Sequence, residues 1–302
     1  FLFVKNILLS KMALFQLYEL VRDEEMSIKF LQEHELLPKT KECINGHEMK
    51  LVMGSPPRWR CYVRDCRKDI GIRNGTWFEG SRISFRTAIL FIYCWTRELT
   101  SVDFCKEDLD MNHNTTVDWN NYLRKVCFFK EESSQTKIGG EGQTVEIDET
   151  LFVRRKNHCG RLIEQQWCFG GICRETREVF VEPVPDRSAK TLMEVLRRRV
   201  HEDTLIMSDM WKGYSRVEKN GYEHLQVNHK FNFVDPETGA HTQNIERVWR
   251  SVKERNKRQC GTRRSMLESY MFEFSWRKRN KENAFKQILA DIKDFHEYHK
   301  KI

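Results

Sequence analysis

The spacing of hydrophobic and polar positions changes about halfway along the chain. In the first half, apolar residues recur at helical spacing over 12–40, and over 84–130 they predict three helices. In the second half, the runs 145–152, 161–173 and 178–183 either alternate with polar residues or stay apolar. Such short runs with turn residues between them predict three consecutive strands in a meander.

Helices and strands alternate in the rest of the second half. Ser188 is a suitable N-cap for a helix over 189–200, and short buried strands are expected at 205–207 and 224–227. Three further helices are predicted, at 242–257, 265–280 and 284–296. A meander, a helix, a fourth strand and more helices is the order of a ribonuclease-H-like fold. In that fold the first and fourth strands are neighbours, so we expect a mixed α/β core of this kind.

Three acidic residues stand at separate places in this predicted core. Asp148 lies within the first strand, Asp209 follows the fourth, and Glu246 lies in the helix after it. Buried carboxylates cost free energy, and converging carboxylates repel one another unless a cation lies between them. We therefore predict that these three acids hold two divalent ions, Mg²⁺ or Mn²⁺, in an arrangement suited to phosphodiester chemistry.

Other acids compete with Glu246. Asp235 and Glu237 lie close to it in the sequence, but the segment 235–239 has the composition of a turn. The alternative for Glu246 itself is a surface residue that pairs with Arg250, four positions further along the same helix.

The two acidic neighbours of Asp148 are expected to point to different faces of the sheet. Successive strand residues point to opposite faces of a sheet, so Glu149 cannot face the same ions as Asp148, whereas Glu146 can. We assign the metal to Asp148 because it lies nearer the centre of the strand. His241 and Asn244 are candidates for placing a phosphate or a water molecule, and an ordinary loop or capping role is the alternative for His241.

Aromatic residues follow Asp209 directly. Trp211 and Tyr214 could stack on bases, but residues of this kind more often pack against the start of a helix. Lys212 between them is a candidate contact for DNA.

A second candidate metal site lies in the first half of the chain. Three residues separate Cys43 from His47, and four separate Cys61 from Cys66. Thiolates and an imidazole suit tetrahedral Zn²⁺, and a metal would explain how a segment with little apolar material folds. The alternative is two unrelated pairs, since the spacing is looser than in common zinc knuckles.

The three helices over 84–130 resemble a helix-turn-helix unit. Residues 112–114 form the turn, and 115–129 is the candidate recognition helix. Its candidate DNA-binding residues are Asn120, Asn121, Arg124 and Lys125. A plain three-helix bundle that joins two domains is the alternative.

Composition and charge add to this picture. The chain has 302 residues, of which 39% are hydrophobic, enough for about two packed domains. The net charge of +8 suits a polyanion. From Arg247 to Lys281 there are twelve Lys or Arg residues and three acids. This is either a solvated helical face or a phosphate-binding surface, and its position after Glu246 favours the second. The DNA-backbone candidates there are Arg247, Arg250, Lys253, Lys257 and Arg258.

Export and membrane insertion are not favoured. No apolar run reaches the ~18 residues of a membrane span. The segment Phe1–Ser10 is apolar but short and has no charged leader, and Met12 is a candidate start. The ten cysteines have no regular spacing, so reduced thiols are expected. Five of them fall in apolar runs and are expected in the core: Cys94, Cys105, Cys127, Cys168 and Cys173.

Seven short strings, taken in order, resemble the Merlin transposases and their bacterial insertion-sequence relatives. The resemblance runs from the region Leu17–Leu20 to the last helix. The strings are Glu146-Ile147-Asp148-Glu149-Thr150, Arg154-Arg155-Lys156, Phe169-Gly170-Gly171, Ser208-Asp209-Met210-Trp211-Lys212-Gly213-Tyr214, Val227-Asn228-His229, Phe233-Val234-Asp235-Pro236 and Gly239-Ala240-His241-Thr242-Gln243-Asn244-Ile245-Glu246-Arg247-Val248-Trp249.

This resemblance implies a zinc ribbon and a helix-turn-helix in front of a catalytic Asp-Asp-Glu core. Asp148, Asp209 and Glu246 are then the catalytic acids. The sequence departs from the family at His47, where relatives often carry Cys. The implied activity is DNA transposition, with the transposon's terminal inverted repeats and a target DNA as partners and a homo-oligomer on DNA. The location would be the nucleus in a eukaryote or the cytoplasm in a bacterium.

Two alternatives remain open. One is a host-adopted DNA-binding protein that no longer cuts DNA, and the other is a plain ribonuclease-H-like nuclease. The expected domains are an N-terminal helical segment at 1–40, a zinc-ribbon-like module at 41–80, a helix-turn-helix-like region at 81–130, a linker at 131–143 and a catalytic domain at 144–302.

Overall fold

The structure, a computed structural model, describes residues 12–133, 136–153, 166–229, 231–258 and 261–300. Contacts divide the chain into two compact units, Phe1–Val126 with Glu282–Ile302, and Cys127–Lys281. The expected domain boundaries differ from this division, which groups residues 282–302 with the first unit, and they stay a prediction. Several expected features lie outside the described residues: the segment Phe1–Ser10, part of the linker, the string Arg154-Arg155-Lys156, and the turn and first residues of the second strand.

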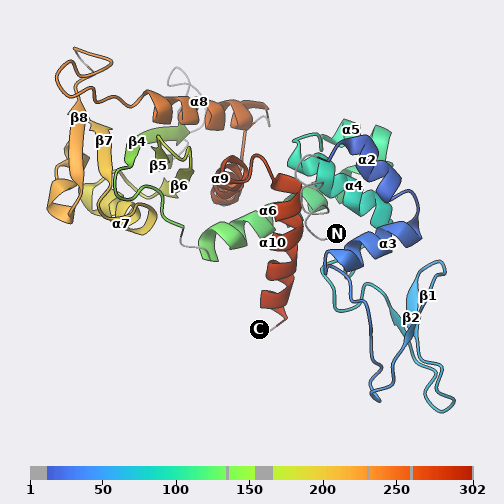
Figure 1. Cartoon of the computed structure of the whole chain (residues 1–302). Helices are drawn as coiled ribbons and strands as arrows, with labels where there is room; N and C mark the ends of the chain where they lie inside the picture. Colours follow the sequence, from blue (N-terminus) through green and yellow to red (C-terminus); the bar gives the residue numbers. More distant parts are fainter. Residues whose placement is uncertain (1–11, 134–135, 154–165, 230, 259–260, 301–302) are drawn as a thin grey trace. The chain divides into compact units, whose positions relative to one another are not determined.

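Helices make up most of the first unit (Figure 1). They are α2 (Leu14–Leu20), α3 (Glu24–Glu33), α4 (Phe85–Thr96), α5 (Val102–Leu109), the start of α6 (His113–Ser133) and α10 (Ala284–His299). Short polar side chains set the starts of three of these helices, since Asp23, Ser84 and Ser101 each accept a hydrogen bond from a first-turn amide. The three helices expected over 84–130 are confirmed.

Helix α4 forms the centre of this unit. Nine of its residues are buried, and it contacts α2, α3, α5 and α10. Aromatic rings join α4 and α3 to the last helix, because the ring of Phe285 lies 5.2 Å from that of Tyr93 on α4 and 6.3 Å from that of Phe30 on α3.

A three-stranded antiparallel sheet lies in the segment 41–80. Its strands are β1 (Lys50–Val52), β2 (Arg58–Arg60) and β3 (Asp69–Gly71), in the order β1-β2-β3. The hydrophobic pattern did not mark these strands individually, because each has only three residues and no clear alternation. The buried core of the sheet is small and consists of Met49, Trp59, Cys43 and Cys61.

A five-stranded mixed sheet forms the second unit. The strands are β4 (Thr144–Val153), β5 (Gln166–Cys173), β6 (Val179–Val184), β7 (Leu205–Asp209) and β8 (Glu223–Val227), in the order β6-β5-β4-β7-β8. The first three strands pair antiparallel, and β7 is parallel to both β4 and β8. The mixed α/β class and the pairing of the first strand with the fourth are therefore confirmed.

Helices cover both faces of this sheet (Figure 1). Helix α7 (Ala189–Arg199) packs on one face with Val145 and Ile147. Helices α8 (Gln243–Arg258) and α9 (Arg264–Arg279) pack on the other face through a second apolar cluster. All five cysteines expected in the core are buried. Among the described residues, no helix is long and apolar enough to span a membrane.

A glycine allows α8 to lie close to the sheet. A Cβ atom at Gly170 would come within 2.9 Å of the Trp249 ring and of the Phe180 carbonyl oxygen. Side chains cannot approach that closely, so the Phe169-Gly170-Gly171 string has a packing reason. This contact helps to set the distance between α8 and the strands β4 and β5.

Candidate functional site

The structure brings the three predicted acids near one another, with Asp148 in the middle of β4, Asp209 at the end of β7 and Glu246 at the start of α8. In the parallel pair of β4 and β7, Glu146 lies opposite Met207. Two residues further along both strands, Asp148 and Asp209 therefore come to the same level and the same face. Glu246, in the first turn of α8, lines an open groove of about 490 Å³ together with Asp148.

The charges of these acids affect one another. Burial raises the pKa of Asp148 well above its usual range, and the negative charges of Glu149, Asp209 and Glu246 raise it further. Such mutual repulsion is what a bound cation would relieve. The arrangement is loose, since among the described residues the only group of three or more His, Cys, Asp or Glu residues whose ligand atoms all lie within 4.8 Å of one another is a different cluster.

Two of the acids have further polar neighbours. The backbone amide of Trp211 donates a 2.9 Å hydrogen bond to Oδ1 of Asp209. His229 Nε2 lies 3.9 Å from Glu246 Oε1 and 2.8 Å from Thr242 Oγ1. The sequence placed His229 in a family string but gave it no role. Its closeness to Glu246 became visible only in the fold.

The aromatic residues after Asp209 are largely packed. Tyr214 is fully buried, so the packing interpretation holds for it. Its hydroxyl donates a hydrogen bond to Glu149, on the sheet face opposite Asp148. Trp211 is half-buried, and the guanidinium of Arg187 lies 3.8 Å from its ring centroid. Lys212 is exposed.

The competing acids near Glu246 belong to a turn, as their composition indicated. Asp235 Oδ1 accepts hydrogen bonds from the backbone amides of Glu237 and Thr238, at 3.1 and 2.9 Å. It also accepts one from the Thr238 hydroxyl at 2.8 Å. These bonds lower the pKa of Asp235 and occupy one of its carboxylate oxygens.

His241 and Asn244 turn towards the protein. The Asn244 side chain donates a 2.7 Å hydrogen bond to Glu146, and His241 Nδ1 lies 3.4 Å from the same carboxylate. Burial lowers the pKa of His241, and the nearby Arg174 lowers it further. These contacts agree with the loop role rather than with contact to a phosphate or a water molecule.

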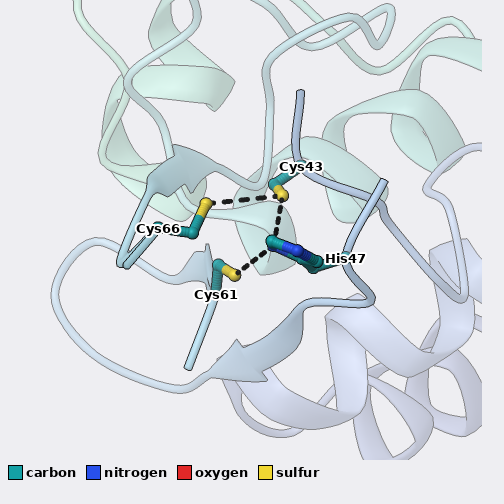
Figure 2. Close-up of side chains that lie close together, drawn as sticks. All are labelled: Cys43, His47, Cys61 and Cys66. Carbon is teal, nitrogen blue, oxygen red and sulfur yellow. Dashed lines mark hydrogen bonds between the residues drawn. The ribbon is translucent and has the colours of Figure 1, made fainter. Parts of the chain in front are cut away.

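The second predicted site is assembled from four side chains (Figure 2). Cys43 Sγ lies 3.6 Å from both His47 Nδ1 and Cys66 Sγ, and Cys61 Sγ lies 3.7 Å from His47 Nδ1. A tetrahedral zinc ion with Zn–S of ~2.3 Å has ligand-to-ligand edges of about 3.6–3.8 Å. The four residues therefore fit a zinc ion, and His47 completes the set in place of a fourth cysteine.

The environment also suits a thiolate at Cys43. Burial opposes ionisation, but hydrogen bonds from the backbone amides of Asn45 and His47 and contacts with Cys66 and Cys61 bring its pKa to about 7. Burial raises the pKa of Cys61. The thiolate is the form that binds metal.

The candidate recognition helix is α6, and its first turn is held by Asn112, whose Oδ1 accepts from the Thr115 amide at 2.9 Å. Asn120 bonds Thr100 and the Thr116 carbonyl. Arg124 is only 7% exposed, so these two residues face the protein. Asn121 is half-buried and Lys125 is exposed, and DNA contact by any of the four stays a prediction.

The basic segment after Glu246 contains two kinds of residue. The five candidates on α8 are all exposed: Arg247, Arg250, Lys253, Lys257 and Arg258. Arg255 and Arg277 instead pair with the buried Glu273, and Arg279 pairs with Glu131 at 2.6 Å. Only part of the positive segment is therefore available to a partner, and within that part Arg250, Lys253 and Lys257 line the groove.

Comparison with known proteins identifies transposase-like sequences. An uncharacterised transposase-like protein of Haemophilus influenzae is 25% identical over 105 residues, which is 35% of this chain and 84% of that protein. The catalytic core of the bovine immunodeficiency virus integrase aligns with 14% identity over 44% of this chain and 79% of that one, at a TM-score of 0.29. A TM-score this low does not establish a shared fold. Residues 138–279 match the family model of the ISXO2-like transposase domain.

Proposed function

We propose that this chain is a DNA transposase with a ribonuclease-H-like core, which cuts DNA at transposon ends and joins it to a target. The observation that carries the proposal is the convergence of Asp148, Asp209 and Glu246 from two strands and one helix. The match of residues 138–279 to a transposase domain supports it. The finer assignment to the Merlin type rests on the strings of the sequence.

Asp148 and Glu246 have different proposed places at the metal site. Asp148 is partly buried between the other two and is the residue proposed to bridge both ions, whereas Glu246 approaches from α8 with a side chain that is 56% exposed. Two Mg²⁺ or Mn²⁺ ions, when bound, would activate the attacking hydroxyl and stabilise the leaving oxygen on phosphorus. The three carboxylates would hold these ions and, through them, position the reacting groups.

The groove beside the acids is the proposed path of the DNA backbone. Arg250, Lys253 and Lys257 line it together with Asp148 and Glu246. Cations spaced along one helix face can neutralise successive phosphates and so hold the strand over the acids. We propose Lys212, Arg247 and Arg258 as further contacts.

The first unit is proposed to recognise the terminal repeats. The zinc site would fix the small sheet, and α6 would present Asn121 and Lys125 to DNA. Assembly of two transposon ends would require a homo-oligomer on DNA. We place the protein with the host's DNA, in the nucleus of a eukaryote or the cytoplasm of a bacterium.

The test is metal-dependent cleavage of DNA that carries the element's ends. Asp148→Asn, Asp209→Asn and Glu246→Gln should each abolish strand cleavage in Mg²⁺ while leaving DNA binding intact. Glu237→Gln is the control, because Glu237 is an exposed acid of the nearby turn and its backbone amide, which bonds Asp235, is unchanged by the substitution. This variant should cleave DNA like the wild type. Wild-type cleavage by any of the three acid variants would rule out the triad.

The same reaction distinguishes the alternatives. Products joined to target DNA indicate a transposase, and cleavage without joining indicates a plain nuclease. Specific binding with no metal-dependent nicking indicates the host-adopted DNA-binding protein.

A further inference from the structure

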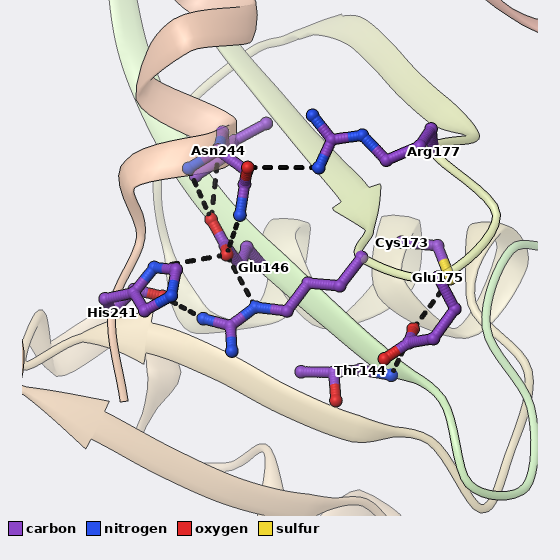
Figure 3. A network of polar contacts seen from close by, with 9 residues as sticks. Thr144, Glu146, Cys173, Glu175, Arg177, His241 and Asn244 are labelled. Atoms are coloured by element: carbon purple, nitrogen blue, oxygen red, sulfur yellow. Dashed lines mark hydrogen bonds and ion pairs between the residues drawn. The ribbon is translucent and has the colours of Figure 1, made fainter. Parts of the chain in front are cut away.

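Glu146 is a completely buried carboxylate two residues before Asp148 on the same face of β4. Its Oε2 atom accepts hydrogen bonds from the backbone amides of Asn244 and Ile245, at 2.8 and 3.2 Å. Its Oε1 atom accepts from the Asn244 side chain and from Arg174 Nε, both at 2.7 Å. Figure 3 shows this carboxylate between the strand and the start of α8.

The two backbone donors lie in the first turn of α8, where amides have no partner within the helix. A carboxylate there satisfies these donors and interacts favourably with the helix dipole. Arg174 compensates the buried charge and also bonds the His241 carbonyl at 2.9 Å, which fastens the segment just before the helix. Asn244 is held in turn by Arg177 at 3.0 Å.

These contacts exclude Glu146 as a ligand of the catalytic ions. Both of its oxygens are occupied by donors, and the side chain has no exposed surface. The sequence alone left this open, because Glu146 and Asp148 share a face. The structure instead gives the two acids different tasks on one strand.

We propose that Glu146 is a positioning residue: by holding the first turn of α8 on β4, it fixes Glu246 relative to Asp148 and so sets the affinity for the divalent ion. Glu246 directly follows Ile245, one of the two residues whose amides bond Glu146. A small shift of that turn would move the Glu246 carboxylate with it. This inference rests on the proposed function, since it assumes that Asp148 and Glu246 share an ion.

The experiment measures Mn²⁺ binding to the full, zinc-loaded chain without DNA, by electron paramagnetic resonance of free Mn²⁺. Glu146→Gln keeps the shape but removes the charge and one acceptor, and should weaken Mn²⁺ binding about 10-fold or more, as for other residues that orient metal ligands. Asn244→Ala removes one of the four donors and should weaken binding by a smaller factor.

Glu182→Gln is the matched control for a lost buried carboxylate. Glu182 lies on β6, is 5% exposed, and pairs with Arg198 and Arg199 at 2.9 and 3.4 Å. This variant should unfold at a lower temperature but bind Mn²⁺ like the wild type.

The possible results distinguish the positioning role of Glu146 from the proposed function of the chain. Wild-type Mn²⁺ affinity in folded Glu146→Gln overturns the positioning role and leaves the proposed function standing. A wild-type chain that binds no Mn²⁺ overturns both. If Glu146→Gln does not fold, Asn244→Ala decides, because it retains Glu146 and its other three bonds; unchanged affinity there also overturns the role.

Discussion

Lys253 of α8 donates a 2.6 Å hydrogen bond from its Nζ to Oγ1 of Thr150 on β4. Thr150 lies two residues after Asp148, so both point to the same face of the sheet. An ammonium group is thus placed beside the candidate metal site, in the groove that Arg250 and Lys257 also line. This arrangement makes the role of the α8 cations directly testable.

Replacing Arg250, Lys253 and Lys257 together by Ala should weaken binding to DNA of any sequence. Each lost phosphate contact lowers the slope of log affinity against log salt by about 0.9, so the slope should fall by roughly 2–3. The measurement is a salt titration of binding to a labelled duplex. Replacing Lys190, Arg216 and Lys219, three exposed cations elsewhere in this unit, changes net charge equally. An equal loss of slope in this control would contradict a specific groove.

Zinc content should be one ion per chain, and it should depend on the four clustered side chains. Cys61→Ala or His47→Ala should reduce bound zinc to near zero and lower the unfolding temperature, because metal binding and folding are coupled in small modules. Cys168→Ala removes a buried thiol of the other unit and should retain the zinc. Metal analysis of purified protein gives the answer, and full zinc in Cys61→Ala would refute the site.

Tyr214→Phe should destabilise the protein by about 1–3 kcal/mol, the range for leaving a buried charged acceptor without its donor. Arg187, whose NH1 lies 3.5 Å away, would then be the remaining cation beside the Glu149 carboxylate among the described ion pairs. Tyr222→Phe is the comparison, because its hydroxyl bonds an uncharged carbonyl at 3.2 Å and should cost less. Urea unfolding measures both variants. The prediction fails if Tyr222→Phe is the more damaging change.

Asp148→Asn should stabilise the metal-free protein while removing its response to Mg²⁺. Burial and three nearby acids raise the pKa of Asp148, so its charged form is unfavourable in the absence of a cation. Removing that charge should add on the order of 1 kcal/mol to the free energy of unfolding, as at other sites that sacrifice stability for function. Added Mg²⁺ should then raise the melting temperature of the wild type alone. A destabilised variant would argue against repulsion at this site.

Acid should destabilise the fold partly through His224. Burial lowers the pKa of His224, and its Nε2 lies 2.8 Å from the Ser208 hydroxyl. The unfolded chain therefore takes up a proton near its usual pKa of about 6.5, before the folded chain does. Stability should be constant above that pH and fall as the pH drops towards the folded-state value. Urea unfolding between pH 7.5 and 5.5 should show a weaker pH dependence for His224→Gln. An identical slope in that variant would count against this origin.

Sequence pattern predicted the second unit well because its elements are long and regular. Apolar residues at helical spacing, such as Leu192 and Leu196 or Val248 and Val252, marked the buried face of each helix. The observed helices α7 and α8 begin and end within about one residue of the expected bounds. The small sheet β1-β2-β3 was missed because strands of three residues leave no measurable period.

The sequence by itself singled out the residues proposed to carry the chemistry: three acids in a strand, a strand end and a helix, and a set of three cysteines and one histidine. The residue types are given by the sequence, and the strand or helix expected around each one follows from the pattern of its neighbours. Only the tertiary structure decided that Glu146 supports α8 rather than binding an ion, that Arg124 turns inward and that His229 lies beside Glu246. Those outcomes depend on which oxygen meets which donor across segments up to about a hundred residues apart, and no local pattern encodes such a distance.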